Sequence, residues 1–280
     1  MGLSSNILWH QTSKNSFYDI LKTKKLRYSY SLERIVPFWG LEPTAFPMIS
    51  VSDYPFSEIS HNKWTYGDYC IGFRQNWGIK VGFSPVWYNS VGSRGLRILS
   101  SVLEEAIKTR SKSFFGASMF LFSHMKFTQA PLKTKKREYN NYRFYDEREW
   151  RVVPYITETD QASIMPFLTE EGYNEFKKKN NGSSLLDIGV DFQYEDIHYI
   201  IVKTEADIQR TKEIVGDRIH IFTKKEVVED VIGIDHHEEI LPSIEQMDYE
   251  AAQRHADRLI QKAKEVWKNR IKNSEEQETI

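Results

Sequence analysis

The sequence has little of what secreted and membrane proteins carry. Its 280 residues include one cysteine, Cys70, so an internal disulfide framework is excluded and a reducing compartment is favoured. No stretch approaches the ~18 consecutive apolar residues of a membrane-spanning helix. The N-terminus also lacks the basic and then apolar segments of a secretory signal. We therefore expect a soluble protein of the cytoplasm with no membrane contact.

A large charge of one sign is absent as well. Lysine plus arginine number 38 and aspartate plus glutamate number 39, so no global field attracts the protein to nucleic acid. One short segment departs from this balance. Its basic residues are Lys133, Lys135, Lys136 and Arg137, with Tyr139 and Tyr142 following them. The pattern favours a solvated loop, and contact with nucleic-acid phosphates is the alternative.

Several signatures of catalysis and metal binding are missing too. The chain has no Gly-rich phosphate loop, no G-x-S-x-G nucleophile turn and no H-E-x-x-H zinc motif. His236 and His237 precede two glutamates, but adjacent side chains diverge on a helix or strand, so we expect no metal site. Cys70 lies inside the apolar segment "YCIGF", which predicts a buried and unreactive thiol.

Short strands alternate with short helices along residues 1–235, which predicts one α+β domain. Residues 96–107 carry leucine and isoleucine at helical spacing. Residues 198–203, 204–216, 218–223 and 224–233 in turn have the patterns of a strand, a helix, a strand and a helix. This run either completes the main sheet or forms a subdomain.

Residues 236–280 form a C-terminal extension. From Asp248 onward the pattern predicts a long helix with a narrow apolar seam, which suits packing against another helix. The seam residues are Ala252, Ala256, Leu259, Ala263 and Val266. This helix either docks on the chain's own body or contacts a partner protein. The final segment, "NSEEQETI", is expected to be disordered.

The segment "YRFYDEREWRVVPYI", residues 142–156, holds the densest group of charges among apolar residues. As a strand it places Glu147, Glu149 and Arg151 on one side, because residues two apart share a face. The alternate residues then face a core. The acidic row is either the floor of an active site or a row of salt bridges within the chain, for which Arg143 is a further partner.

Three polar intrusions into apolar strands support an active site. His10 lies in "ILWHQT", Ser50 and Ser52 share a face in "MISVSD", and the two glutamates share a face further on. Together they supply what cleavage of the nicotinamide glycosidic bond of NAD requires. A donor holds a ribose or phosphate, hydroxyls organise the pocket, and one carboxylate stabilises the positive charge that develops on the ribose. The second carboxylate activates or orients the acceptor.

Two long segments also carry a family pattern. They are "FPMISVSDYPFSEISHNKWTYGDYCIGFRQNWGIKVGFSPVWY" and "FYDEREWRVVP". Their Pro-x-Ser-x-Ile, Tyr-Gly-x-Tyr, Trp-Gly-Ile-Lys and Glu-Arg-Glu-Trp-Arg motifs resemble those of the AbiGi family of abortive phage-infection proteins. The likeness covers roughly residues 7 to 203. It implies a role in phage defence, where the family is described as the antitoxin half of a two-gene system.

A more distant likeness is to ADP-ribosyltransferase-like folds, including DarT-type toxins that modify DNA. Those proteins also open with a His-x-Thr strand and a short helix, and they place a catalytic glutamate late in the fold. The likeness implies a split mixed or antiparallel sheet with flanking helices and an NAD site. His10 would then hold the NAD ribose, with Thr12 two residues further along the strand.

The same likeness assigns roles to the remaining residues. The implied catalytic residues are Glu149, Glu147 and His10. The implied cofactor-binding residues are His10, Thr12, Ser50, Ser52 and Tyr69. Many such enzymes stack a tyrosine on nicotinamide, for which Tyr28, Tyr30 and Tyr69 are the candidates.

Two functions are consistent with the sequence. In the first, the protein binds NAD and transfers ADP-ribose to a macromolecular acceptor or hydrolyses the cofactor. In the second, it is a non-catalytic antitoxin that binds and neutralises a partner toxin, with the C-terminal helix as a contact. The acidic row would then only stabilise the fold.

Overall fold

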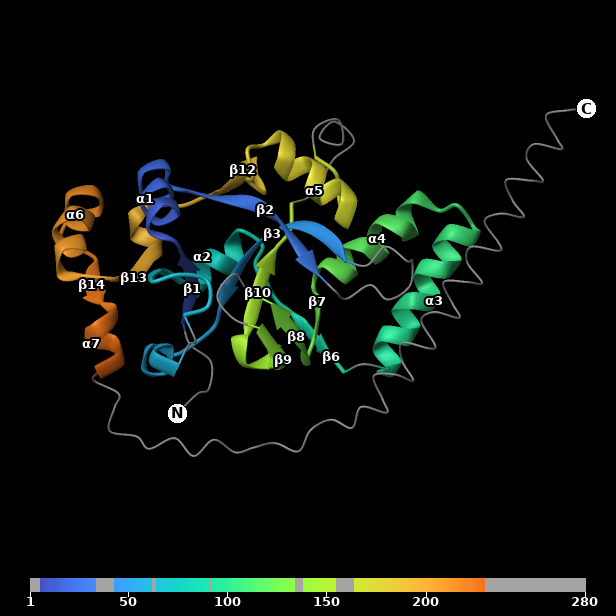
Figure 1. Cartoon of the computed structure of the whole chain (residues 1–280), viewed down its shortest axis with the longest axis horizontal. Helices are drawn as coiled ribbons and strands as arrows, with labels where there is room; N and C mark the ends of the chain where they lie inside the picture. Colours follow the sequence, from blue (N-terminus) through green and yellow to red (C-terminus); the bar gives the residue numbers. More distant parts are fainter. Residues whose placement is uncertain are drawn as a thin grey trace, which may run out of the picture.

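The computed structural model describes residues 6–33, 43–61, 64–90, 92–133, 138–154 and 164–229. These residues form an α+β fold around one mixed sheet (Figure 1). The sheet follows the order β12-β2-β3-β1-β4-β13-β14, and β10 joins it through β3. Its strands are β1 (Ile7–Thr12), β2 (Lys25–Glu33), β3 (Thr44–Ser52), β4 (Tyr69–Arg74), β10 (Glu149–Val152), β12 (Leu185–Asp191), β13 (Ile197–Val202) and β14 (His220–Thr223). The pair β13–β14 is parallel, whereas the neighbouring pairs are antiparallel.

Shorter strands complete the β structure. The pair β6 (Trp87–Asn89) with β7 (Met125–Phe127) and the pair β8 (Gln129–Lys133) with β9 (Glu138–Arg143) form two small sheets. Two further short strands, β5 (Ser84–Pro85) and β11 (Leu168–Thr169), pair with β10 and β3 respectively.

The helices pack against the sheet. They are α1 (Lys14–Thr23), α2 (Gln75–Lys80), α3 (Arg94–Lys108), α4 (Lys112–Ser123), α5 (Glu170–Lys179), α6 (Glu205–Val215) and α7 (Lys224–Glu229). Serines begin three of them, because the hydroxyls of Ser13, Ser93 and Ser111 accept a backbone N–H from the first turn of α1, α3 and α4. In Figure 1, α3 and α4 lie at the end of the molecule opposite α6 and α7.

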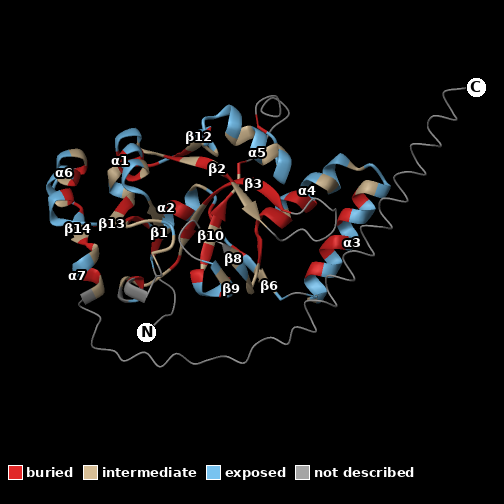
Figure 2. Cartoon of the chain, viewed as in Figure 1, coloured by how far each residue is buried: buried red, intermediate tan, exposed pale blue. Residues whose placement is uncertain are grey.

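The two faces of the sheet pack on different elements. Leu8, Val51 and Ile71 join a core with α1, α2 and α6, and we call this side the α1 face. Phe46 and Met48 point the other way and pack on α3 and α4, and we call that side the α3 face. Figure 2 shows buried residues concentrated along the central strands, with the outer sides of the helices exposed. Trp9, Cys70 and Ile201 of the central strands form a third cluster with Val227 of α7.

Several sequence predictions are confirmed at this level. The fold is α+β with a mixed sheet, and α3 lies where helical spacing predicts it. The run after residue 197 forms β13, α6, β14 and α7, and because β13 pairs with β4 it completes the main sheet. Residues 236–280 lie outside the described residues, so the C-terminal helix stays a prediction. In the described part of the chain, no helix is long and apolar enough to cross a membrane.

The prediction of one strand over residues 142–156 is wrong. β9 ends at Arg143, a 3-10 turn follows from Phe144 to Glu147, and β10 begins only at Glu149. Arg148 between them adopts a left-handed conformation with φ 41°, which an extended strand does not allow. Glu147 therefore belongs to a turn, and strand alternation does not govern its direction.

Candidate functional site

Hydrogen-bond register brings the predicted serines and Glu149 to one face of the sheet. Ser52 of β3 lies opposite both Trp9 of β1 and Glu149 of β10. Ser50 lies opposite Arg151. Directly opposed residues point the same way in an antiparallel pair, and the alternation along β3 puts this row on the α3 face.

Arg151 fixes the Glu149 carboxylate from one side. The guanidinium is fully buried, and its Nε donates to Oε1 of Glu149 at 2.7 Å while Nη2 reaches Oε2 at 3.1 Å. Nη2 also contacts Oε1 of Glu33 at 2.6 Å, and Nη1 donates to the carbonyl of Ser123 at 2.8 Å. The planar fork of a guanidinium matches a carboxylate bidentately, so both oxygens of Glu149 are engaged.

Lys126 of β7 closes the site from the other side. Its Nζ lies 2.7 Å from Oε2 of Glu149 and 2.8 Å from Oε2 of Glu147. The hydroxyl of Tyr66 donates to the remaining oxygen of Glu147 at 2.9 Å. The side chains of the lysine and both glutamates are 10% exposed or less. We call Glu33, Lys126, Glu147, Glu149 and Arg151 the ion cluster.

The cations of the ion cluster keep Glu149 ionised. Burial alone would raise the pKa of Glu149, but the charges of Arg151 and Lys126 hold that pKa well below its ordinary value. Burial likewise opposes the charge on Lys126, yet Glu149 and Glu147 raise the pKa of its ammonium far above the usual value. A carboxylate held in this way is a weak proton acceptor, which is poorly suited to general base catalysis.

The ion cluster carries three carboxylates and two cations, so its formal charge is −1 when all five groups are ionised. Burial raises the pKa of Glu33, and the nearby charge of Arg151 only partly opposes that rise. Glu33 therefore takes up a proton more readily than Glu149 does.

Tyrosines surround the glutamates. They are Tyr54, Tyr66, Tyr88 and Tyr142. The hydroxyl of Tyr88 accepts the backbone N–H of Glu149 at 2.8 Å, and that of Tyr54 donates to the carbonyl of Asp146. Burial, followed by the charge of Glu147, raises the pKa of Tyr142, so its phenol stays protonated at neutral pH. The site is thus polar and aromatic, with its charges held inside.

His10, Thr12 and Tyr69 lie on the opposite face. His10 follows Trp9 in β1 and stands opposite Ile71 of the α1-face core, while Thr12 stands opposite Tyr69. Nδ1 of His10 lies 3.2 Å from the carbonyl oxygen of Ser50, and burial lowers the pKa of this imidazole. The sheet therefore separates these three predicted residues from the glutamates. A single ligand on one face does not contact both groups.

A second polar cluster lies on the α1 side, around Asp207 of α6. Its carboxylate is buried and accepts hydrogen bonds from Tyr18 at 3.2 Å, Tyr69 at 2.8 Å and Thr204 at 2.7 Å. Nζ of Lys14 lies 2.7 Å from the same carboxylate. Burial and the adjacent carboxylate raise the pKa of Tyr69 to about 12. Burial alone would raise the pKa of Asp207, but the hydrogen bonds from Lys14, Thr204 and Tyr69 lower it.

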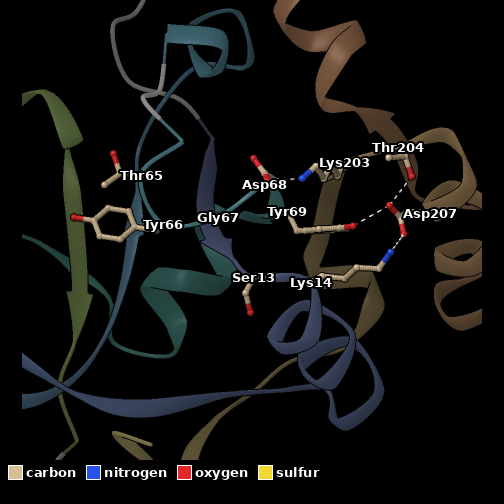
Figure 3. A pocket seen from close by; sticks show the side chains of 10 residues that line it. All are labelled: Ser13, Lys14, Thr65, Tyr66, Gly67, Asp68, Tyr69, Lys203, Thr204 and Asp207. Atoms are coloured by element: carbon tan, nitrogen blue, oxygen red, sulfur yellow. Dashed lines mark hydrogen bonds and ion pairs between the residues drawn. The ribbon is translucent and has the colours of Figure 1, made fainter. Parts of the chain in front are cut away.

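A pocket of about 760 Å³ opens beside Asp207 (Figure 3). It is lined by Ser13, Lys14, Thr65, Tyr66, Gly67, Asp68, Tyr69, Lys203, Thr204 and Asp207. Figure 3 shows Tyr66 and Tyr69 pointing in opposite directions from the segment that carries both. The hydroxyl of Tyr66 reaches Glu147 of the ion cluster, and that of Tyr69 reaches Asp207. Residues 65–69 thus join the two polar sites.

Gly67 allows this segment to pass close to β1. Its φ is +153°, and a Cβ built on it would lie 1.9 Å from the carbonyl oxygen of Thr12. No residue with a side chain fits there without moving the backbone. The close approach is what places Asp68 and Tyr69 beside the start of α1.

The other residues considered from sequence have structural surroundings. Tyr28 and Tyr30 are buried in the α1-face core, where the hydroxyl of Tyr30 donates to the carbonyl of Met165 at 2.8 Å. Cys70 is fully buried, and burial raises the pKa of its thiol, as an unreactive cysteine requires. Arg143 pairs with Asp146 at 3.0 Å, outside the ion cluster.

Most of the predicted nucleic-acid contact falls beyond what the structure describes. Lys135, Lys136 and Arg137 lie outside the described residues, and only the backbone of Lys133 is described, at the end of β8. Their contact with nucleic acid stays a prediction. The described residues contain no group of three or more histidine, cysteine, aspartate or glutamate residues arranged to hold a metal ion. His236 and His237 lie outside that part of the chain.

Sequence reasoning missed Lys126 and Asp207, the central residues of the two polar sites. Lys126 stands in "HMKF", where one charge interrupts an apolar run, and this is the same signal that singled out the glutamates. Asp207 sits in the first turn of α6, where an acidic residue has a routine explanation as a partner of the helix dipole. Only the fold shows that two tyrosines from elsewhere converge on it.

Comparison with known proteins identifies the family. A family model described as "Putative abortive phage resistance protein AbiGi, antitoxin" matches residues 15–203, which is more than half of the chain. The chain belongs to the AbiGi family. Among curated proteins and among solved structures, no match was found. Membership associates this AbiGi protein with abortive infection, a form of defence against phage.

The residues matched by the family model cover one polar site of this AbiGi protein fully and the other only partly. The matched range contains all five residues of the ion cluster. It begins after His10 and ends before Asp207. The ion cluster is therefore part of the region that defines the family, whereas part of the pocket lies beyond it.

Proposed function

We propose that this AbiGi protein is a non-catalytic antitoxin that binds the toxin of its two-gene system and neutralises it. The observation that carries the proposal is the state of Glu149. Its carboxylate is buried, both of its oxygens are engaged by Arg151 and Lys126, and its face of the sheet is opposite that of His10. Three charge-assisted hydrogen bonds hold this buried carboxylate, and a residue held in this way stabilises a fold.

An apolar surface on α3 and α4 supports a protein partner. Ile98 is 65% exposed, Phe114 is 60% exposed and Phe120 is 52% exposed. Exposed apolar side chains mark a protein contact site where they gather into one patch. We call these three residues the α3–α4 surface and propose that it contacts the toxin. The predicted apolar seam of the C-terminal helix is a second proposed contact.

Co-expression tests the contact directly. The toxin is expressed alone, with the wild-type chain, and with Ile98→Lys or Phe114→Lys, while growth and co-purification are measured. We expect the wild type to restore growth and the two variants to lose most of the rescue. Ile79→Lys is the matched control, because Ile79 is 56% exposed on α2 and lies outside the proposed surface. Equal rescue by all variants would refute the contact at α3–α4.

The seam of the C-terminal helix is tested in the same assay. Leu259→Lys places a charge in the proposed apolar seam, and Lys262→Gln, three residues on, changes a charged position outside it. We expect only the first to weaken co-purification with the toxin. If neither does, the helix has no part in the contact.

A second candidate function is an ADP-ribosyltransferase-like NAD site, and one observation favours it. Ser52 stands directly opposite Glu149 on adjacent strands, and Ser50 lies on the same face. An NAD molecule there would have serine hydroxyls, tyrosines and two carboxylates within one polar site. His10, Thr12 and Tyr69 would not take part on that face. In the transfer, the bond from nicotinamide to the ribose breaks and nicotinamide leaves with the bonding electrons. Water or a macromolecular hydroxyl or amine bonds to the ribose carbon and releases its proton to solvent.

Incubation with NAD labelled in its ADP-ribose part separates the two functions. Under the antitoxin proposal, neither hydrolysis nor transfer to protein or DNA exceeds that of a protein-free control. Glu149→Gln should then neutralise the toxin as well as the wild type does, provided that circular dichroism shows it folded. Turnover of NAD that disappears in Glu149→Gln would overturn the non-catalytic proposal and establish the second one.

A further inference from the structure

The pocket beside Asp207 has a charge balance that suits an anion. Its lining includes Lys14, Lys203, Asp68 and Asp207, and Lys224 contacts Asp68 from the edge. The lining itself carries two ammonium groups and two carboxylates, and Lys224 at the edge brings the local charge to +1. The toxin contact proposed above involves none of these residues.

The carboxylates do not use up the donors of the lysines. Asp68 is shared, with Lys203 at 3.1 Å from one oxygen and Lys224 at 2.6 Å from the other. Asp207 already accepts three hydroxyl hydrogen bonds before Lys14 is counted. Each ammonium has three N–H donors, so Lys14 and Lys203 keep donors for a ligand. Their side chains are 50% and 57% exposed, which leaves them accessible from solvent.

Two helices begin at the same pocket. Ser13 and Lys14 form the start of α1, and Thr204 precedes α6. The N-terminus of a helix carries a partial positive charge, and it adds to that of the lysines. Figure 3 shows the side chains of Lys14 and Lys203 on the two sides of Tyr69, both turned toward acidic partners at the pocket.

We propose that this pocket binds a small molecule through a phosphate group. A phosphate offers several acceptor oxygens and a charge close to −2, which match the lysine donors and the local positive charge. The volume of about 760 Å³ lies within the range of pockets that hold metabolites of nucleotide size. Hydroxyls of Ser13 and Thr65 and the partly exposed ring of Tyr66 line the remainder of the pocket.

Calorimetric titration of the full-length protein with AMP, inorganic phosphate and adenosine tests the proposal. We expect AMP and phosphate to bind at low ionic strength, adenosine to show no binding, and the affinity for AMP to fall as salt is added. Lys14→Gln and Lys203→Gln should each weaken AMP binding roughly fivefold, which is the effect of a half-exposed charge pair. Lys203→Arg should restore most of the affinity.

A matched control separates the pocket from general charge effects. Lys212→Gln removes the same charge from α6, at a residue that pairs with Asp217 and does not line the pocket. It should bind AMP like the wild type. The proposal is overturned if AMP and adenosine bind equally, if Lys14→Gln and Lys203→Gln match the control, or if neither phosphate nor AMP binds at millimolar concentration. Thermal melting of every variant shows whether a loss of binding reflects unfolding.

Discussion

The ion cluster and the pocket around Asp207 are built from the same kinds of residue and differ in how their charges meet solvent. In the ion cluster, Lys126 and Glu149 have side chains that are 10% and 7% exposed, and every carboxylate has a cation in contact. In the pocket, Lys14 and Lys203 are about half exposed beside an open cavity. The first arrangement is closed and the second is accessible.

This difference in exposure predicts that the ion cluster stabilises the fold and that the pocket binds a ligand. A buried charge that loses its partner is strongly destabilising, because neither water nor another group replaces the contact. A half-exposed charge that loses its partner is solvated at once, so it is free to bind something else. Substitutions in the ion cluster should therefore lower stability strongly and leave ligand binding unchanged. Substitutions of the pocket lysines should weaken ligand binding and change stability little.

Replacing Arg151 should have the largest effect. Arg151→Met leaves Glu149 and Glu33 without their shared cation in a buried site, and we expect it to lower the free energy of unfolding by about 3–5 kcal/mol. Urea denaturation followed by circular dichroism measures the change. Arg143→Met is the matched control, because Arg143 is 44% exposed and pairs only at the surface, where the expected loss is about 0–1 kcal/mol. Equal losses in the two variants would remove the distinction between the closed and the accessible site.

Lys126→Met should cause the next largest loss in the free energy of unfolding, about 2–3 kcal/mol. Glu149 keeps Arg151 as a partner in this variant, whereas Glu147 keeps only uncharged donors. The same urea measurement applies. Glu147→Gln should be less destabilising in the Lys126→Met background than in the wild type, since the first change has already removed the ion pair. Additive losses would show that the two residues are not coupled.

Acid should weaken the fold through the carboxylates of the pocket. The pKa of Asp207 and that of Asp68 are lowered in the folded chain, the latter chiefly by its hydrogen bond with Lys224. An aspartate in the unfolded chain has a pKa of about 3.9. The ionised carboxylates of Asp207 and Asp68 therefore stabilise the fold fully above that pH. The effect is lost as the pH falls toward the folded value, because the unfolded chain binds protons first.

Melting temperatures measured from pH 7 downward check this sign. We expect a decline that begins at about pH 4–5. Asp207→Asn should start from a lower melting temperature at pH 7 and lose less on acidification, since one of the titrating groups is gone. A melting temperature that rises in acid would instead assign the dominant role to Glu33, whose pKa is raised.

The sequence predicted the helices, the strands and the polar residues within apolar runs better than it predicted the contacts between distant residues. Helical periodicity located α3 and α6, because each of them has one buried side. The apolar run of β13 located that strand, which is buried on both faces. The polar residues of the acidic segment were also recognised, since charges within apolar runs are rare. The partners were not predictable: Lys126 lies 21 residues from Glu147, and the hydroxyl of Tyr69 meets Asp207 across 138 residues.

The error over residues 142–156 and the separation of His10 from Glu149 have a common cause. Alternation along one strand says which residues share a face, but not which face of the sheet that is. A single left-handed residue, Arg148, ends the alternation, and the register Trp9–Ser52–Glu149 decides that His10 points away. Register depends on pairing between distant strands, which one sequence does not reveal.

Replacing Lys14 should have the smallest effect on stability and the clearest effect on binding. Lys14→Gln removes an ion pair to Asp207 from a side chain that is 50% exposed, while the three hydroxyl donors remain in place. We expect little change in urea denaturation, because water replaces the lost contact. Together with the weaker AMP binding expected of the same variant, this would assign the lysine to a ligand. A loss as large as that of Lys126→Met would show instead that the pocket, like the ion cluster, holds its charges to stabilise the fold.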